Sequence, residues 1–289
     1  MRNDSVAFLG IGLMGRPMTA NLLANGFPMS LWNRTRAKAE RFESQARIAE
    51  TPAEAVRDAD VVITMLENGD VVEAVLMDDA VLAALKPGAV VVDMSSIPPA
   101  MARAHSQRLN ELGLPYVDAP VSGGTVGAEK AVLSIMAGGD ASVLDRLGPI
   151  LGCLGTVTRV GPVGAGQVAK LANQAIVGIT IGAVSEALLL AERAGADPSA
   201  VRQALMGGFA GSRILELHGQ RMLDRNFEPG APARIQHKDL TMILDEARDC
   251  GLDLPLSAST LEAYRRLLEA GHGDLDHSSL LLELERRNS

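Results

Sequence analysis

The sequence predicts an α/β fold in which an N-terminal doubly wound parallel sheet precedes an all-helical domain, with a long helix joining the two. The first observation is that short β-branched runs alternate with helical patterns through the first half of the chain. The second is a glycine-rich turn after the first of these runs. The third is a change near residues 161–166, after which Ala and Leu recur at helical spacing. We therefore expect an α/β domain over residues 1–161 and a helical domain over residues 162–289.

The first half contains five runs typical of strands and two clear helical patterns. Thr51-Pro52-Ala53-Glu54 marks a further helix start, with a capping Thr, Pro at the first helical position and Glu three residues after the cap. Beyond the domain boundary, the pattern predicts one long helix that ends near residue 194. The expected strands are residues 6–9, 28–32, 61–65, 90–93 and 116–118, and the expected helices are residues 17–25 and 100–112.

Composition excludes several classes of protein. Of 289 residues, 47% are hydrophobic and 21% charged, and the net charge is −8, so a disordered chain and a nucleic-acid or membrane-surface binder are disfavoured. Two cysteines cannot form a disulfide framework. Residues 1–10 lack the order of a signal peptide, and the apolar segment 161–185 contains Lys170 and Asn173, typical of a buried helix rather than a membrane span. We expect a cytoplasmic protein with neither nucleic-acid nor membrane partners.

The glycine-rich turn is the first candidate binding site. Gly10, Gly12 and Gly15 form G-x-G-x-x-G between a strand and a helix, which is the fingerprint of Rossmann-type dinucleotide binding. The first glycine permits the turn, the second lets a pyrophosphate approach the backbone, and the third allows close packing of the helix on the strand. The alternative is a turn that merely connects the two elements.

The end of the second strand indicates which dinucleotide binds. NAD enzymes place a carboxylate there to accept the ribose hydroxyls, whereas this strand ends in Asn33, Arg34 and Thr35. Arg34 can pair with a 2′-phosphate, and its two neighbours can add hydrogen bonds. The sequence therefore predicts NADP in preference to NAD. The alternative is that Arg34 is an ordinary surface arginine, like the nearby Arg36 and Lys38.

Lys170 is the candidate catalytic residue. It is the only charged residue between Arg159 and Glu186, and Asn173 and Gln174 share its helical face. A lysine in such surroundings suits a general acid that protonates a developing alkoxide. The alternative is a lysine whose ammonium group reaches solvent from the end of a helix.

A third segment, Asp118-Ala119-Pro120-Val121-Ser122-Gly123-Gly124, follows a strand at the edge where doubly wound sheets bind ligands. The hydroxyl of Ser122 and the backbone N–H groups of Gly123 and Gly124 suit a small carboxylate. The alternative is a plain turn between a strand and a helix.

Taken together, these motifs resemble the β-hydroxyacid dehydrogenase family, which includes 3-hydroxyisobutyrate dehydrogenase, tartronate semialdehyde reductase and the glyoxylate and succinic semialdehyde reductases. The resemblance covers essentially the whole chain. It includes two further motifs, Asp93-Met94-Ser95-Ser96 and Lys238-Asp239-Leu240. One departure is Gln174, where many members have a second asparagine; tartronate semialdehyde reductases resemble this chain there. Imine reductases share the glycine loop but lack the lysine.

The resemblance implies a role for each matching residue. Lys170 would be catalytic, Ser96 would lie beside the nicotinamide, and Lys238 would close over the cofactor. Ser122, Gly123 and Gly124 would hold the substrate carboxylate. Asn173 and Gln174 are further substrate-binding candidates, and the remaining cofactor candidates are Leu13, Met14, Met65 and Leu66.

The leading hypothesis is an NADPH-dependent reductase that converts a short aldehyde acid, of the tartronate semialdehyde, glyoxylate or succinic semialdehyde type, to a hydroxyacid. The alternatives are an NAD(P)-dependent 3-hydroxyisobutyrate or related 3-hydroxyacid dehydrogenase and, from another class, a non-catalytic dinucleotide-binding module. The family also implies a homodimer or homotetramer. We expect no metal, because the run from His272 to His277 is typical of a solvated loop.

Overall fold

The computed structural model describes residues 4–289; residues 1–3, which belong to the predicted first domain, lie outside the described residues. The chain divides into two compact units, Met1–Lys170 and Leu171–Ser289. The division falls within the long helix α9 (Ala165–Arg193), and the domain boundary at residues 161–162 stays a prediction.

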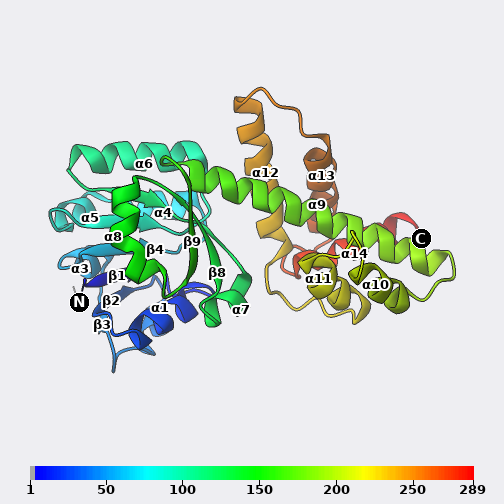
Figure 1. Ribbon diagram of the computed structural model, residues 1–289, viewed down its shortest axis with the longest axis horizontal. Helices are drawn as coiled ribbons and strands as arrows, with labels where there is room; N and C mark the ends of the chain where they lie inside the picture. Colours follow the sequence, from blue (N-terminus) through cyan, green and yellow to red (C-terminus); the bar gives the residue numbers. More distant parts are fainter. Residues whose placement is uncertain (1–3) are drawn as a thin grey trace. The chain divides into compact units, whose positions relative to one another are not determined.

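The first unit is built on a mostly parallel sheet with the strand order β3-β2-β1-β4-β5-β6-β8-β7, and β9 pairs with β8 (Figure 1). The order reverses between β1 and β4, so the sheet is doubly wound and its switch point lies between these strands. Strand β8 runs antiparallel to β6 and β7, and β9 runs parallel to β8. The strands are β1 (Val6–Leu9), β2 (Met29–Trp32), β3 (Arg47–Ile48), β4 (Val61–Thr64), β5 (Val90–Asp93), β6 (Tyr116–Asp118), β7 (Val121–Ser122), β8 (Leu133–Gly138) and β9 (Gly155–Gly161).

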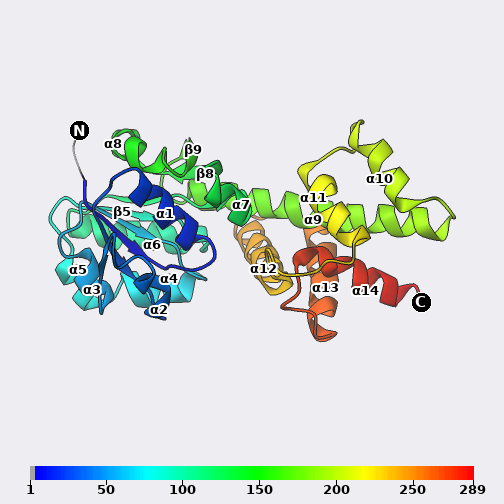
Figure 2. The same ribbon diagram turned by 90° about the horizontal axis from the view of Figure 1, so that it is seen from below.

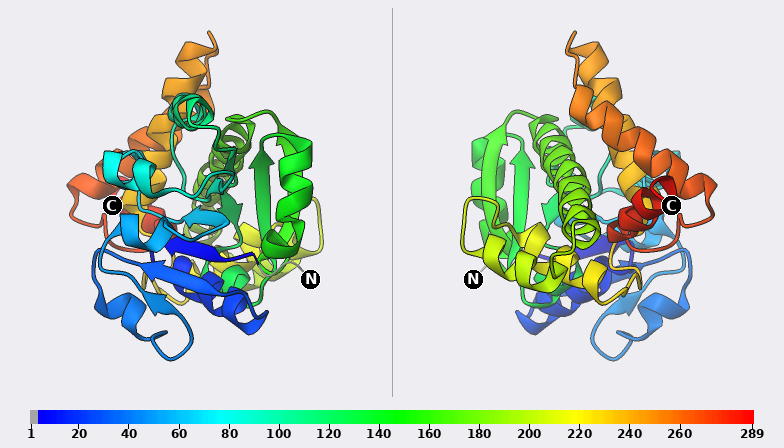
Figure 3. Two further views of the ribbon diagram at one scale, coloured as in Figure 1. Left: turned by 90° about the vertical axis from the view of Figure 1, so that its left-hand side faces the viewer. Right: turned by 90° about the vertical axis from the view of Figure 1, so that its right-hand side faces the viewer.

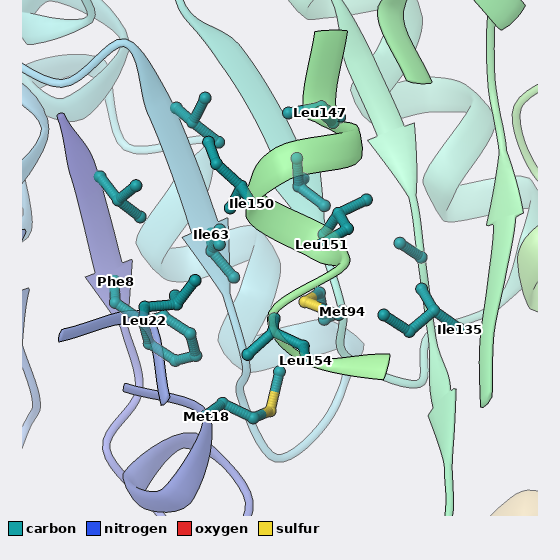
Figure 4. Close-up of a cluster of buried hydrophobic side chains, with 14 of the residues drawn as sticks. Phe8, Met18, Leu22, Ile63, Met94, Ile135, Leu147, Ile150, Leu151 and Leu154 are labelled. Carbon is teal, nitrogen blue, oxygen red and sulfur yellow. The ribbon is translucent and has the colours of Figure 1, made fainter. Parts of the chain in front are cut away.

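The central strands β1, β4 and β5 are buried at every position, because helices cover both faces of the sheet. Along β1, Val6 and Phe8 pack into one hydrophobic core, while Ala7 and Leu9 pack into the other. Helices α1 and α8 cover the first face, where Leu147, Ile150 and Leu151 of α8 lie over the strands (Figure 4). Helices α3, α4, α5 and α6 cover the second face (Figure 2). The helices of this unit are α1 (Gly15–Ala24), α2 (Ala37–Glu40), α3 (Pro52–Val56), α4 (Gly69–Leu76), α5 (Asp79–Ala84), α6 (Pro99–Glu111), α7 (Gly124–Glu129) and α8 (Ala141–Leu151).

The second unit is all-helical in its described residues, which confirms the predicted fold class. Its core is formed by side chains such as Ile181, Leu240, Tyr264 and Leu267, and α12 and α13 pack along one another (Figure 3). Among the described residues, α9 is the one helix long and apolar enough to span a membrane, a property that core helices share. Besides α9, this unit contains α10 (Pro198–Met206), α11 (Arg213–Leu223), α12 (Ala233–Asp249), α13 (Pro255–Glu269), the 3₁₀ turn η1 (His277–Ser279) and α14 (Leu280–Arg287).

Candidate active site

The glycine turn after β1 has the close approaches that the sequence pattern predicts. Gly10 has φ +110°, and a side chain there would place its Cβ 2.3 Å from the carbonyl oxygen of Met65. A Cβ on Gly15 would lie 1.9 Å from the carbonyl oxygen of Gly10. A Cβ on Gly12, by contrast, would have no atom within 4 Å. Two glycines are therefore needed for packing, and the backbone at Gly12 is open to a ligand.

This turn also leads into a helix end that can bind an anion. The cap residue of α1, Met14, makes no side-chain capping bond. Arg16 N donates to Gly12 O, and Pro17 has no N–H group, so an anion at this helix end would be bound by the N–H groups that precede Arg16. The turn follows β1 at the switch point of the sheet, where doubly wound sheets bind nucleotides. Leu13 lies exposed beside it, and Met14 is half-buried. The described residues thus fit a dinucleotide pyrophosphate.

The three residues after β2 differ from one another in environment. Asn33 holds the glycine turn, since its Oδ1 accepts from Ile11 N (2.9 Å) and its Nδ2 donates to Thr35 O (2.9 Å). Sequence reasoning had expected Asn33 to add a hydrogen bond to the cofactor. Arg34 and Thr35 are exposed. Arg36, in contrast, is ion-paired with Glu40 and with Glu50.

The loops after β4 and β5 are fixed to each other by a buried carboxylate that the motif contained but sequence reasoning did not assign. Asp93 Oδ1 accepts from Thr64 Oγ1 (2.7 Å) and from Ser95 N (2.9 Å). Ser95 Oγ in turn accepts from Leu66 N (2.9 Å). Burial raises the pKa of Asp93, while its hydrogen bonds to Ser95 and Thr64 lower it. This network positions the predicted cofactor residues Met65, Leu66 and Ser96, all half-buried.

The segment after β6 brings the predicted substrate residues to the same edge of the sheet. Ser122 ends β7 and is half-buried, and Gly123 and Gly124 are exposed. These glycines have φ +137° and +62°, backbone conformations that other residues adopt only with strain. Glycine is therefore required here by the turn, whatever else the segment binds.

Lys170 lies against this segment. Its Nζ donates a hydrogen bond to Val121 O at 2.9 Å, and Val121 directly precedes Ser122. The lysine is half-buried on α9, so its ammonium group is held against the chain rather than extended into solvent. The structure thus brings Lys170 together with the residues predicted to hold the substrate carboxylate.

The remaining predicted site residues lie in the second unit and converge on one carboxylate. Asn173 Nδ2 donates to Gln174 Oε1 (2.8 Å), and Gln174 Nε2 donates to Asp239 Oδ2 (2.7 Å). Lys238 Nζ forms an ion pair with Asp239 Oδ1 (3.3 Å). Asp239 belongs to the motif Lys238-Asp239-Leu240 but had no predicted role, because the motif shows only that it follows Lys238.

The tail segment requires a correction. We expected the run ending in His277 to be a solvated loop, but Asp276 and His277 are buried and lie beside His218. The Nε2 atoms of the two histidines are 3.2 Å apart. The Asp276 carboxylate accepts hydrogen bonds from Ser278 and from the backbone N–H groups of residues 230 and 231. Burial acts to raise its pKa, but hydrogen bonds from His218 and Ser278 hold that pKa well below the usual range. The carboxylate ties the loop before α12 to η1.

Comparison with known proteins identifies the family. The profile of the NAD-binding domain of 6-phosphogluconate dehydrogenase matches residues 5–164, and that of the NAD-binding region of NADP-dependent 3-hydroxyisobutyrate dehydrogenase matches residues 164–284. A 2-hydroxy-3-oxopropionate reductase from Escherichia coli is 44% identical over 283 residues, 97% of each chain. The chain belongs to the β-hydroxyacid dehydrogenase family. The protein is therefore an NAD(P)-dependent oxidoreductase acting on CH–OH groups.

Solved structures agree with this assignment. A 3-hydroxyisobutyrate dehydrogenase from Mycobacterium tuberculosis, solved with L-serine, superposes with a TM-score of 0.88 at 33% identity, covering 97% of this chain and 99% of that one. A protein named Psf3, solved with NADP⁺ and 2-OPP, has a TM-score of 0.87 at 25% identity, covering 96% and 99%. The family resemblance stated from the sequence is thus confirmed.

Proposed function

We propose that this enzyme uses NADPH to reduce a short aldehyde acid of the tartronate semialdehyde type to the corresponding hydroxyacid, with Lys170 as the general acid. The observation that carries the proposal is the hydrogen bond from Lys170 Nζ to Val121 O. It places the one charged side chain of this part of α9 next to Ser122 and its glycines. The similarity to a 2-hydroxy-3-oxopropionate reductase favours this substrate class, because tartronate semialdehyde is the same compound.

The residues divide the chemistry between them. A nicotinamide cofactor bound at the glycine turn would supply the hydride for the carbonyl carbon. Ser122, Gly123 and Gly124 bind the carboxylate of the substrate through a hydroxyl and backbone N–H groups and so orient its carbonyl. Lys170 gives a proton to the carbonyl oxygen as negative charge develops there, which lowers the barrier for hydride transfer. In the oxidative direction the neutral amine of Lys170 would accept that proton.

The preference for NADPH is supported by the end of β2. Arg34 is exposed and directly follows Asn33, which is anchored to the glycine turn. A guanidinium so placed can pair with a 2′-phosphate, and the strand ends without a carboxylate that would repel one. The structure of Psf3 with NADP⁺ is consistent with this preference.

A second candidate function is the oxidation of 3-hydroxyisobutyrate or a related 3-hydroxyacid, favoured by the fold similarity to the Mycobacterium tuberculosis enzyme. The experiment that separates the two is an assay of purified protein with NADPH and with NADH against glyoxylate, succinic, tartronate and methylmalonate semialdehydes, and with NADP⁺ against 3-hydroxyisobutyrate. We expect the highest kcat/KM with NADPH and tartronate semialdehyde. Higher kcat/KM for hydroxyacid oxidation would favour the second function, and no turnover would favour a non-catalytic module.

Replacing Lys170 tests the assigned mechanism. Lys170→Ala should reduce kcat by ~10²–10⁴, the usual range for a general acid, and leave the affinity for NADPH unchanged. Lys170→Arg should not restore turnover, because a guanidinium with a pKa above ~12 donates its proton poorly. Ser122→Ala should instead raise KM for the acid substrate with a smaller change in kcat. Near wild-type turnover in Lys170→Ala would overturn the assignment of the general acid.

A further inference from the structure

Asp118 is a buried carboxylate whose two oxygens bind the entry of the helix that carries Lys170. It ends β6, and its side chain is inaccessible to solvent. Its Oδ1 accepts from Gly164 N at 2.7 Å, and its Oδ2 accepts from Gln167 N at 2.8 Å. Backbone N–H groups at a helix entry have no partner within the helix, so Asp118 supplies partners from a different element. Gln167 lies three residues before Lys170.

Two glycines make room for this carboxylate. A Cβ on Gly138 would lie 2.5 Å from Asp118 Oδ1, and a Cβ on Gly166 would lie 2.8 Å from Asp118 Oδ2. Both distances are too short for any residue larger than glycine. The helix entry and β8 therefore pack directly on Asp118. If that contact loosens, neither glycine has a side chain that could fill the space.

Gln167 extends the contact to the loop that carries Ser96. Its Nε2 donates to Ser95 O (2.9 Å), and its Oε1 accepts from Ile97 N (3.1 Å). All three of these groups are buried. The first turn of α9 is thus tied to the loop after β5, which the family resemblance places beside the nicotinamide, and to the end of β6.

We propose that Asp118 is a positioning residue that fixes the amine of Lys170 relative to the substrate-binding segment. Asp118 begins the same short segment that provides Val121 O to Lys170 Nζ and Ser122 to the substrate. Asp118 therefore joins the helix that carries the proton donor, Lys170, to the segment that would hold the substrate, which is the proton acceptor. This inference rests on the proposed role of Lys170 as the general acid.

The ionisation of Asp118 makes the contact dependent on pH. Burial raises the pKa of Asp118 to about 6, although its hydrogen bonds from Gly164 and Gln167 lower it and nearby Asp93 raises it further. Tyr116, on the same strand, also interacts electrostatically with Asp118, and Arg103 of α6 lies against Gly164 at the helix entry. When the carboxyl group is protonated, one of its oxygens becomes a hydroxyl donor and a much weaker acceptor for an N–H group. The helix entry should then loosen as the pH falls through about 6.

The stability of the folded state changes with pH in the opposite direction. Because the pKa of Asp118 in the folded protein is above its ordinary value of 3.8, folding favours the protonated form. The contribution of Asp118 to stability is therefore fully present below about pH 4 and is lost as the pH rises through about 6. A carboxylate retained in a form that opposes stability at neutral pH is typical of a functional site.

The first experiment needs no substrate. Purified protein is treated with a limiting amount of an acetylating reagent at pH 8, and labelling of Lys170 is measured by peptide mass spectrometry relative to exposed Lys130. We expect Asp118→Asn to raise the ratio several-fold, because the amide would present a donor to one of the two N–H groups. The matched control is Asp60→Asn: Asp60 also accepts from a backbone N–H, at Ser5 N (3.0 Å), but precedes β4 at the opposite edge of the sheet. An unchanged ratio in Asp118→Asn would overturn the proposal.

The second experiment is a double-mutant cycle on kcat. Asp118→Asn should reduce kcat by ~10–100-fold with little change in KM, as expected for a misplaced catalytic group. In the Lys170→Ala background, the same substitution should reduce kcat by less than about twofold. Multiplicative effects would show that Asp118 acts independently of Lys170 and would contradict the proposal. If Lys170→Ala turns over normally, the proposed function fails, whereas the labelling ratio still reports on the positioning.

The pH profile and a second variant complete the test. In the wild type, kcat should fall below about pH 6, and in Asp118→Asn this acidic limb should disappear. Gln167→Ala keeps the backbone contact to Asp118 but removes both side-chain bonds, so it should give a smaller rise in Lys170 labelling even if Asp118→Asn does not fold. An acidic limb that persists in a folded Asp118→Asn enzyme would contradict the role of Asp118 ionisation.

Discussion

At the scale of single residues, Arg34 and Arg36 differ in whether they are free to bind a phosphate. Arg36 is held by Glu40 and Glu50, whereas Arg34 is exposed at the end of β2. Arg34→Ala should weaken NADPH binding by about tenfold to over a hundredfold, because a charge-assisted hydrogen bond contributes ~1.5–3 kcal/mol. NADH binding should hardly change. Isothermal titration of both cofactors measures this difference, with Arg36→Ala as the control.

Equal losses for the two cofactors in Arg34→Ala would show that the residue has a structural role. An effect of Arg36→Ala as large as that of Arg34→Ala would show that the phosphate site lies elsewhere on this loop.

At this scale, the sequence could predict local features of the backbone, whereas the partners of side chains could not be predicted. The openness of Gly12 follows from its place in a short motif, and the structure agrees. The amide of Asn33, by contrast, accepts a hydrogen bond from the glycine turn. This could not be predicted, because the order of residues does not show the direction of a side chain. Asp118 and Asp239 were unassigned because their partners lie 46 and 65 residues away in sequence.

At the scale of elements, the turn between β1 and α1 contains two glycines that are needed for different reasons. A Cβ on Gly15 would collide with the backbone at Gly10, whereas a Cβ on Gly12 would enter open space. Gly15→Ala should therefore lower the thermal midpoint by several degrees or prevent folding, because the helix must shift away from the strand. Gly12→Ala should keep the wild-type midpoint and weaken both cofactors, since it would fill space that a pyrophosphate needs. Thermal melts with and without NADPH separate the two effects.

A different outcome would contradict the prediction for each of these two variants. A Gly12→Ala protein that binds NADPH normally would contradict the placement of the pyrophosphate, and a fully stable Gly15→Ala protein would contradict the close approach to Gly10.

Elements with a strong pattern were predicted well. The strands at residues 6–9, 90–93 and 116–118 have the predicted bounds, and the long helix ends at Arg193. The Thr51 cap is confirmed, since its Oγ1 accepts from Glu54 N at 3.1 Å. Strands β3, β7, β8 and β9 were missed. β3 and β7 are two residues long, β8 ends in glycine, and β9 has glycine at both ends and several exposed positions. Their apolar pattern is therefore weak, and their pairing depends on distant partners.

At the scale of the whole molecule, the two-part fold follows from one change in hydrophobic periodicity. Residues before the change alternate between two buried faces of a sheet, and residues after it recur at helical spacing, so the fold class could be predicted without any contact information. The substrate could not, because it depends on groups contributed by loops after several strands. Localisation and the number of subunits stay predictions.

The predicted homo-oligomer has a specific structural basis in α9. Four of its exposed positions, Ala172, Ile176, Ala183 and Leu190, recur at spacings of four and seven residues and form an apolar stripe along one face, which exposed Glu186 interrupts between Ala183 and Leu190. Ile176 and Leu190 are 67% and 71% exposed. Large apolar side chains exposed along one helix face are uncommon on a monomer in water, and a symmetric pairing of two copies would cover them. We therefore expect a dimer or tetramer at micromolar concentration by light scattering.

Substitutions on the stripe test whether α9 forms the contact. Leu190→Lys should shift the scattering mass toward that of a single 30.4 kDa chain, because association would bury an unpaired charge. Leu256 provides the control: it is 67% exposed on α13, away from the stripe, and Leu256→Lys should keep the wild-type mass. Both proteins should retain the helical content of the wild type by circular dichroism. A monomeric wild type would refute the oligomer, and an unchanged mass in Leu190→Lys would show that the subunits meet through another surface.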